Sequence, residues 1–269
     1  MSETPARRIA LFIDFENLVT NTGITPSSFD LQPSLDRLLE KGKVIFRRAY
    51  CDWARFREAK GRLHDHGVEL IDVPPSTRAG KNSADMRLVI DALELCYARE
   101  HIDTFVIASG DSDFVPLASK LRENDKYVIG LGVKKSTSPV FVKACDEFLY
   151  LRADDERPAR AEKSDKKAER PAKADAKKRE LPAIARQVLS NLLDRATGPL
   201  NPSFIKETIV RKEPDFDERD HGFSSFSRLL EAAEKEGLCQ RIQQGRQWYV
   251  VAKDSPRSGA PADDLGEEP

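Results

Sequence analysis

The first half of the chain alternates short apolar runs with stretches of helical spacing. The run Ile9–Ile13 is continuously apolar, which is typical of a strand buried on both faces. Further strand candidates in this half lie at 44–50, 68–73, 104–108, 127–131 and 147–151. Between them, helical spacing predicts helices at 53–66, at about 84–97, at 114–124 and directly after Ser138-Pro139. This alternation predicts an α/β domain over residues 1–151, with a parallel sheet and helices on both of its faces.

The pattern changes completely at Arg152. Residues 152–180 hold eleven basic and eight acidic side chains and two prolines, with no apolar period. Such a segment cannot bury enough apolar surface to offset its loss of conformational entropy on ordering. We therefore expect a charged flexible linker, with a marginal solvated helix as the alternative.

An apolar period returns at Leu181. It predicts three helices, around 184–193, 204–210 and 223–233, followed by two strands on either side of the turn Gln244-Gly245. Three helices and a β-hairpin predict a small winged-helix domain over residues 181–252. The acidic tail from 253 to 269 is expected to be disordered.

Composition narrows the class of protein. Hydrophobic residues make up 39% and charged residues 33% of the chain, and the formal net charge is −1. A balanced charge argues against coating of nucleic acid along the whole surface but permits a local basic track. The four cysteines are widely spaced, which favours reduced, buried thiols over disulfides or a zinc site. No apolar stretch is long enough for a signal sequence or a membrane span, so we expect a cytoplasmic protein without a membrane partner.

Aspartates follow two of the expected strands. Asp14 comes directly after the first apolar run, and Asp111 and Asp113 follow the strand at 104–108. Asp85 lies in the first turn of an expected helix. Because ligands of open α/β sheets bind beyond the carboxyl ends of the strands, these four carboxylates are expected at one rim if the two strands are neighbours.

Clustered carboxylates repel one another unless a cation neutralises them. Mg²⁺ or Mn²⁺ suits oxygen ligands and keeps waters that a substrate phosphate can replace. Such an ion polarises a phosphorus–oxygen bond and activates water. The pattern therefore predicts phosphodiester hydrolysis, and the chain has no nucleotide-binding glycine motif that would point elsewhere.

Each residue also has a structural interpretation. Asp14 and Asp111 are placed to cap helices, and Asp85 to complement a helix dipole. Asn17 either caps a helix or orients the substrate or a metal-bound water. Ser109 either brings a hydroxyl near the site or makes a turn. The joint pattern favours a functional cluster.

Asp91 needs a separate argument. It follows Asp85 by six residues, a rotation of about 240° on a helix, so the two carboxylates do not share a face. Arg87 precedes Asp91 by four residues, and a surface ion pair is the alternative. We expect Asp91 to support the site from behind the ligands at most, as we expect of Ser109.

Several basic residues are candidates for phosphate contacts. Lys81, Arg47, Arg48, Lys134 and Lys135 qualify if they reach the rim, and Arg228, Arg241 and Arg246 are candidates in the second half. From this set we predict Lys81, Arg47, Arg228 and Arg246 as RNA-binding residues.

With these residues in view, the first half resembles the NYN family of PIN-like nucleases. The matching segments, in the order of the family, are Ile13-Asp14-Phe15-Glu16-Asn17-Leu18, Lys81 with Asp85 and Asp91, and Ser109-Gly110-Asp111-Ser112-Asp113-Phe114. The resemblance implies a PIN-like Rossmann-type sheet and RNA cleavage that depends on Mg²⁺ or Mn²⁺. It places metal binding at Asp14, Asp85, Asp111 and Asp113, with Asn17 beside them. The family often has Lys-Gly-x-Asp where this chain has Lys81-Asn-Ser-Ala-Asp85, which leaves the role of Lys81 open.

The second half resembles the LOTUS domain, also called OST-HTH, which is a winged helix found with NYN domains. The likeness rests on the segment from Gly222 to Leu230 and on Gly237-Leu238. It implies binding of RNA or of a protein partner. Phe223 and Phe226 are expected to pack in the core rather than to stack on bases, since aromatic residues three apart on an apolar helix face usually point inward.

Two rivals to a ribonuclease remain. The first is a non-catalytic RNA-binding or regulatory protein with the same fold, and the intact set of acids argues against it. The second is a haloacid-dehalogenase-like phosphatase, which would resemble Asp-x-Asp at the first strand. Here Glu16 stands two residues after Asp14, so this rival is weak.

Overall fold

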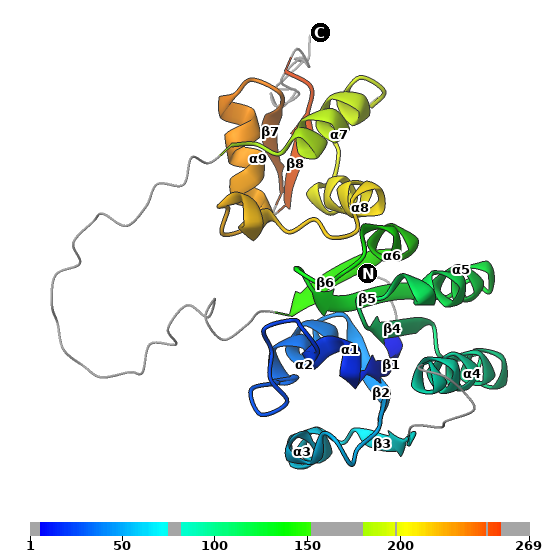
Figure 1. Ribbon diagram of the computed structural model, residues 1–269. Coiled ribbons are helices and arrows are strands. Elements are labelled where there is room, and N and C mark those ends of the chain that lie inside the picture. Colours follow the sequence, from blue (N-terminus) through cyan, green and yellow to red (C-terminus); the bar gives the residue numbers. More distant parts are fainter. Residues whose placement is uncertain (1–5, 75–81, 152–179, 197, 246, 254–269) are drawn as a thin grey trace, which may run out of the picture. The chain divides into compact units, whose positions relative to one another are not determined.

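The computed structural model describes residues 6–74, 82–151, 180–196, 198–245 and 247–253 (Figure 1). The chain divides into two compact units, one of Met1–Arg170 with Val210–Phe216 and one of Pro171–Ile209 with Asp217–Pro269. The expected linker, apart from Glu180, and the expected tail, apart from Lys253, lie outside the described residues.

The first unit is built on a six-stranded sheet, and all of its paired strands are parallel. Its strands are β1 (Arg7–Asp14), β2 (Gly42–Cys51), β3 (Glu69–Asp72), β4 (Thr104–Ala108), β5 (Tyr127–Val133) and β6 (Glu147–Leu151). Their order in the sheet is β3-β2-β1-β4-β5-β6. The strand order therefore reverses between β1 and β4, and such a switch point opens a crevice at the carboxyl ends of the strands.

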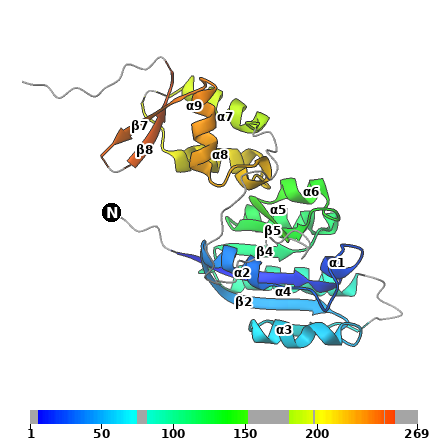
Figure 2. The ribbon, with the colours of Figure 1, turned by 90° about the vertical axis from the view of Figure 1, so that its left-hand side faces the viewer.

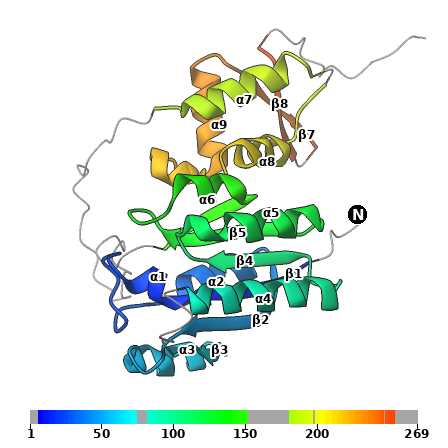
Figure 3. The ribbon, with the colours of Figure 1, turned by 45° about the vertical axis from the view of Figure 1, so that its right-hand side comes forward.

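Helices cover both faces of this sheet. One face carries α1 (Phe15–Val19), α2 (Gln32–Leu39) and α3 (Lys60–Asp65), and the other carries α4 (Ser83–Ala98), α5 (Val115–Glu123) and α6 (Pro139–Ala144). Figure 3 shows α4 and α5 in front of the strands, and Figure 2 shows the opposite face, with α2 in front. The α/β class with a parallel sheet between helices is confirmed.

Strand β1 explains why the first apolar run is unbroken. Ile9, Leu11 and Ile13 belong to the core on one face, and Ala10 and Phe12 belong to the core on the other. All five side chains are fully buried. Successive strand residues point to opposite faces, so a central strand between two helix layers needs apolar residues at every position. This strand therefore fixes the position of Asp14, its last residue.

The helix expected at 53–66 is wrong in its first half. A 3-10 turn, η1 (Arg57–Ala59), leads into α3 only at Lys60. Trp53 is buried, and its indole N–H donates to the carbonyl of Ile71 at 3.0 Å. Docking of this indole against β3 holds residues 52–56 in a turn instead of a helix.

Helices α1 and α2 had no counterpart among the expected elements. They have five and eight residues, too few to repeat a helical apolar period clearly. Phe15, Leu18, Leu35 and Leu38 are nonetheless buried in the same core. Tertiary packing therefore stabilises both helices.

The remaining elements are α7 (Ala183–Leu193), α8 (Pro202–Lys212), the 3-10 turn η4 (Glu218–His221), α9 (Phe226–Lys235) and the antiparallel hairpin of β7 (Gln240–Gln244) and β8 (Gln247–Val251). Leu200 adds an antiparallel bridge to Val250. The third helix starts at Phe226 rather than at 223 because the Ser225 hydroxyl caps it, accepting from the Arg228 backbone N–H. The winged-helix assignment stays a prediction.

Candidate active site

The carboxyl ends of β1 and β4 lie side by side. These strands pair in parallel with Ile13 opposite Ala108, so Asp14 and Ser109 end neighbouring strands. Asp14 is 6% exposed, and Ser109 is fully buried. The condition on which the expected cluster depended, that these strands are neighbours, is met.

Ser109 connects two of the aspartates. Its hydroxyl donates to Asp14 Oδ2 at 3.0 Å and accepts from the Asp111 backbone N–H at 3.2 Å. The hydroxyl therefore orients one carboxylate while it holds the start of the loop that carries the other. Of the two interpretations of Ser109, the structure favours the hydroxyl close to the site.

Asn17 fastens the loop after β4 to α1. Its side-chain oxygen accepts from the Gly110 backbone N–H at 2.8 Å, and its own backbone N–H donates to Asp14 Oδ1 at 3.4 Å. A Cβ at Gly110 would lie 3.0 Å from the Ser136 carbonyl oxygen, so this loop packs closely enough to favour glycine. Asn17 therefore links the two strand ends, and its side chain does not cap a helix.

Asp14 and Asp111 also act as helix caps. The Asp14 side chain caps α1, and Asp111 Oδ1 accepts from the Asp113 backbone N–H at 3.0 Å at the start of η2 (Ser112–Phe114). Capping engages Oδ1 of each carboxylate. The structural and functional interpretations of these residues are thus compatible.

These strand ends open into a cleft of about 630 Å³. Asp14, Asn17, Asp85 and Asp111 line it, and Asp85 reaches it from the first turn of α4, as expected. The other lining residues are Glu16, Thr20, Asp52, Arg55, Val73, Pro74, Asn82, Ser83, Ala84 and Ser136.

Asp113 departs from the expected cluster. Its side chain is exposed and is not among those that line the cleft, and Asp113 Oδ2 accepts from the Asn82 side chain at 3.4 Å. Asp113 is the second residue of the 3-10 turn η2, and its partner Asn82 does line the cleft, so the expected role of Asp113 stays a prediction.

Burial and repulsion act together on Asp14. Burial raises its pKa most, the Asp85 charge raises it further and the Asp111 charge adds to this, so that the pKa reaches about 7. Hydrogen bonds from Ser109 and from the Asn17 backbone oppose the rise. Burial and the neighbouring charges therefore favour the protonated form of Asp14, and a bound cation would favour the ionised form.

The donor set fits a hard divalent cation held by few protein ligands. In the part of the chain that the structure describes, no three histidine, cysteine, aspartate or glutamate side chains converge closely enough to hold a metal ion. Mg²⁺ commonly uses one or two carboxylates, with water and substrate phosphate in its other positions. The cleft offers several carboxylate oxygens for this purpose, and the repulsion between them is what a bound cation would relieve.

Asp91 lies outside the cleft lining, on a different face of α4 from Asp85. It is 4% exposed, and its carboxylate accepts from Arg48 at 3.1 Å, Tyr50 at 3.0 Å and Arg87 at 2.9 Å. Burial and the Asp91 charge raise the pKa of Tyr50, so its phenol stays protonated and donates. The expected pair with Arg87 is present, but its carboxylate is buried rather than at the surface.

The predicted RNA contacts fare differently. Arg47 does not line the cleft: its guanidinium donates to the carbonyl of His66 at 2.6 Å and to that of Val44 at 3.3 Å. Its guanidinium is thus engaged by the chain before β3, and its predicted contact with RNA stays a prediction. Lys81 and Arg246 lie outside the described residues.

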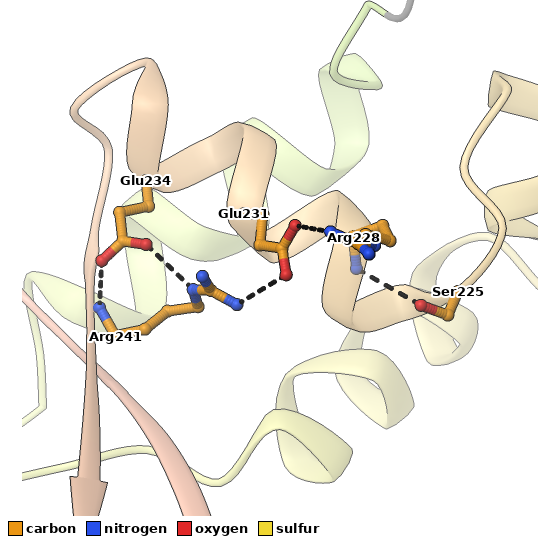
Figure 4. A network of polar contacts seen from close by, with 5 residues as sticks. All are labelled: Ser225, Arg228, Glu231, Glu234 and Arg241. Atoms are coloured by element: carbon orange, nitrogen blue, oxygen red, sulfur yellow. Dashed lines mark hydrogen bonds and ion pairs between the residues drawn. The ribbon is translucent and has the colours of Figure 1, made fainter.

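Arg228 and Arg241 pair with acids of α9 (Figure 4). Arg228 Nη1 contacts Glu231 at 2.7 Å, and Arg241 contacts both Glu231, at 3.3 Å, and Glu234, at 2.9 Å. The hydrogen bond from Arg228 is the largest cause that lowers the pKa of Glu231. Phosphate binding at either arginine would have to compete with these carboxylates. Phe223 is buried, as expected, whereas Phe226 is only partly so.

Asp52 and Arg55 were missed by sequence reasoning. Both line the cleft, directly after β2. The rule that located Asp14 would have found Asp52, since β2 neighbours β1 and the parallel strands end at the same edge. The helix wrongly expected from Trp53 concealed Arg55.

No helix in the described segments has both the length and the apolar character that a membrane crossing requires.

Comparison with known proteins adds a family and two relatives. Residues 8–152 match the family described as the NYN domain. An uncharacterised protein of Methanocaldococcus jannaschii is 27% identical over 144 residues, which are 54% of this chain and 55% of that protein. The chain thus spans about half the length of this curated relative. This chain is also similar to a protein of unknown function from Vibrio parahaemolyticus whose crystal structure is known. The two sequences are 24% identical, the TM-score is 0.48, and the match covers 58% of this chain and 98% of the other.

Proposed function

We propose, on the ground that this chain belongs to the NYN domain family, that its first unit is a metal-dependent ribonuclease. One observation carries the proposal: the buried Asp14 carboxylate, with a pKa raised to about 7, faces Asp85 and Asp111 at the switch point of the sheet. Structural aspartates are normally arranged to avoid such repulsion. A cleft lined by several carboxylates is suited to bind a divalent cation, and the cation can in turn bind a substrate phosphate.

Of the carboxylates Asp14, Asp85 and Asp111, which line the cleft, one or two would bind Mg²⁺ or Mn²⁺ directly, and water would fill the other positions of the ion. When bound, the ion would polarise the scissile phosphodiester and lower the pKa of a water. Asp113 and Asn17, also predicted as catalytic residues, would act from the border of this group, Asn17 by holding the β4 loop in place.

The chain's own residues prepare the cleft for this chemistry. Ser109 keeps Asp14 Oδ2 in one orientation and holds the backbone N–H of Asp111 with the same oxygen. Asp14 would have to be ionised to hold a cation, so binding of the cation would be coupled to release of the Asp14 proton. Asp91, in its network with Arg48 and Tyr50, braces α4 against β2 and thereby steadies Asp85.

The second unit would act as a LOTUS-like module that binds RNA or a protein partner. The specific alternative for the whole chain is a non-catalytic RNA-binding or regulatory protein that retains the fold. The acids Asp14, Asp85 and Asp111, which a degenerate site would be expected to lose, still line one cleft, and this argues against the alternative.

The test is cleavage of a labelled single-stranded RNA by the purified chain with Mn²⁺, with Mg²⁺ or with chelator. We expect cleavage with either metal and none with chelator. Asp14→Asn and Asp111→Asn should each lower the rate at least a hundredfold, while Asp65→Asn, an exposed change on α3, should leave it unchanged. Cleavage that survives in the first two variants would assign the activity to another site. Intact RNA binding without cleavage in any metal would favour the non-catalytic alternative.

A further inference from the structure

The cleft has a strong imbalance of charge. Asp14, Glu16, Asp52, Asp85 and Asp111 line it, and Arg55 is the only basic side chain among its described lining residues. RNA brings further negative charge into this cleft. One divalent cation can neutralise only part of the charge of five carboxylates. A basic side chain that lines the cleft therefore contributes strongly to binding of the negatively charged RNA.

Arg55 forms an ion pair with Glu16, which also lines the cleft. The guanidinium Nη1 lies 2.8 Å from Glu16 Oε1, and the two side chains are 59% and 39% exposed. An ion pair this exposed is weak and exchanges readily with solvent ions. The Arg55 guanidinium is therefore ordered by Glu16 but remains available to another anion.

The aromatic ring of Phe56 lies against the Arg55 guanidinium, with 5.4 Å between the guanidinium carbon and the ring centroid. The Phe56 ring in turn packs edge to face on the Phe15 ring, with ring centroids 5.5 Å apart. Phe15 is fully buried and stands in the chain between Asp14 and Glu16. The contacts of Arg55 with Phe56, and of Phe56 with the buried Phe15, thus join Arg55 to the end of β1, where Asp14 lies.

We propose that Arg55 binds a backbone phosphate of single-stranded RNA, adjacent to the phosphodiester that is cut, and that Glu16 is the anion this phosphate displaces. This proposal rests on the function proposed above and assigns the part of the site that holds the strand. The planar guanidinium suits two oxygens of one phosphate, a geometry that a lysine ammonium cannot reproduce.

The displacement gives Glu16 a measurable role. Glu16 competes with RNA for Arg55 and adds to the negative charge of the cleft. Removal of its charge should therefore tighten RNA binding, whereas removal of a metal ligand or a structural brace would weaken cleavage. Arg55→Ala is expected to weaken RNA binding and Glu16→Gln to strengthen it. An unchanged kcat in both variants distinguishes this proposal from loss of a metal ligand or of a structural contact.

The experiment compares the full-length chain with Arg55→Ala, Arg55→Lys and Glu16→Gln. Arg57→Ala is the matched control, because Arg57 is exposed, lies two residues away and does not line the cleft. Values of kcat and KM are measured on a short single-stranded RNA with Mn²⁺. The Kd for the same RNA is measured by fluorescence anisotropy with chelator, where no metal-dependent cleavage interferes. Thermal unfolding shows that each variant is folded.

We expect Arg55→Ala to raise KM and Kd about tenfold, the size of one charge-assisted contact, with kcat within twofold of the unchanged chain. Arg55→Lys should recover only part of the loss, and Glu16→Gln should lower KM and Kd about threefold. The salt dependence of log Kd should become shallower by about 0.7 in Arg55→Ala. Arg57→Ala should change each quantity by less than twofold.

Three results would overturn the proposal. They are equal effects of Arg55→Ala and Arg57→Ala, a loss of kcat at unchanged KM in Arg55→Ala, and a loss of kcat in Glu16→Gln. The ribonuclease proposal fails separately. If the unchanged chain cleaves nothing, but Arg55→Ala still loses RNA affinity in chelator relative to Arg57→Ala, the binding role of Arg55 stands without the enzyme.

Discussion

At the scale of single residues, Asp14 combines two requirements that oppose each other. Its position at the end of a central strand buries it, and its partners across the cleft are two further carboxylates. Both features favour the protonated form, while a cation ligand must be ionised. The folded chain without metal therefore holds this residue under electrostatic stress.

The raised pKa of Asp14 predicts how the stability of the chain depends on pH. The pKa of Asp14 is raised from 3.8 to about 7, so the unfolded state releases the proton first as pH rises. The free energy of unfolding contributed by this group then falls between about pH 4 and pH 7, and it stays low above pH 7.

Asp14→Asn should accordingly stabilise the chain while it abolishes cleavage. The amide has no charge to repel but loses one hydrogen bond, so we expect a gain of about 1–3 kcal/mol at pH 8. Denaturant unfolding with chelator measures it, and the gain should vanish near pH 4. A variant less stable than the unchanged chain at pH 8 would contradict the shifted pKa.

Ser109 is the second residue whose effect has a clear direction. Ser109→Ala removes the hydroxyl that donates to Asp14 and accepts from the Asp111 backbone N–H, so both proposed metal ligands lose orientation. We expect Mn²⁺ binding to weaken at least tenfold, as measured by isothermal titration calorimetry. Ser112→Ala, an exposed change in the same loop, is the control and should bind Mn²⁺ normally. Similar affinities for both variants would show that the hydroxyl does not position the ligands.

At the scale of elements, Asp91 joins α4 to β2. Its buried carboxylate receives three donors, two of them from β2, which neighbours the strand that carries Asp14. The helix could otherwise slide along the sheet and move Asp85 away from the cleft. We therefore expect Asp91 to support the position of Asp85 although it does not line the cleft.

Asp91→Asn should destabilise the chain by about 3 kcal/mol at pH 7, because Arg48 and Arg87 lose a buried partner charge. Glu94→Gln, an exposed change on the same helix, should alter stability by less than about 0.5 kcal/mol. Urea unfolding of both variants decides the matter. Equal stabilities would mean that the arginines find other partners.

At the scale of the whole molecule, the family match and the sheet core fall within the same part of the chain. Residues 8–152 match the family, and the six strands with their helices lie between Arg7 and Leu151. We expect a fragment of residues 1–151 to unfold cooperatively and to keep its kcat on a short RNA. Circular dichroism during heating and single-substrate kinetics test this. A fragment that lacks a cooperative transition would show that the fold depends on the rest of the chain.

The success of the sequence-based predictions varied with the physical origin of each element. All six strands of the sheet were expected. The central strands β1 and β4 are apolar and buried along most of their length and stand out in the chain, whereas β2 and β3 carry charged residues and were found from shorter apolar runs. Helices α1 and α2 were missed, since short helices that depend on packing leave little periodic signal. Trp53 misled in the opposite direction, because its side chain holds a turn through a contact with Ile71, far away in the sequence.

The candidate site divides in the same way. The sequence by itself determined the α/β class, the strand-end positions of Asp14 and Asp111, and the helix-start position of Asp85, because these depend on local patterns. Tertiary structure alone decided that Asp113 is not among the residues that line the cleft, that Arg47 is engaged elsewhere and that Arg55 joins the rim. It also decided the raised pKa of Asp14. Strand order and burial set these features, and both arise from contacts between segments that the linear pattern does not relate.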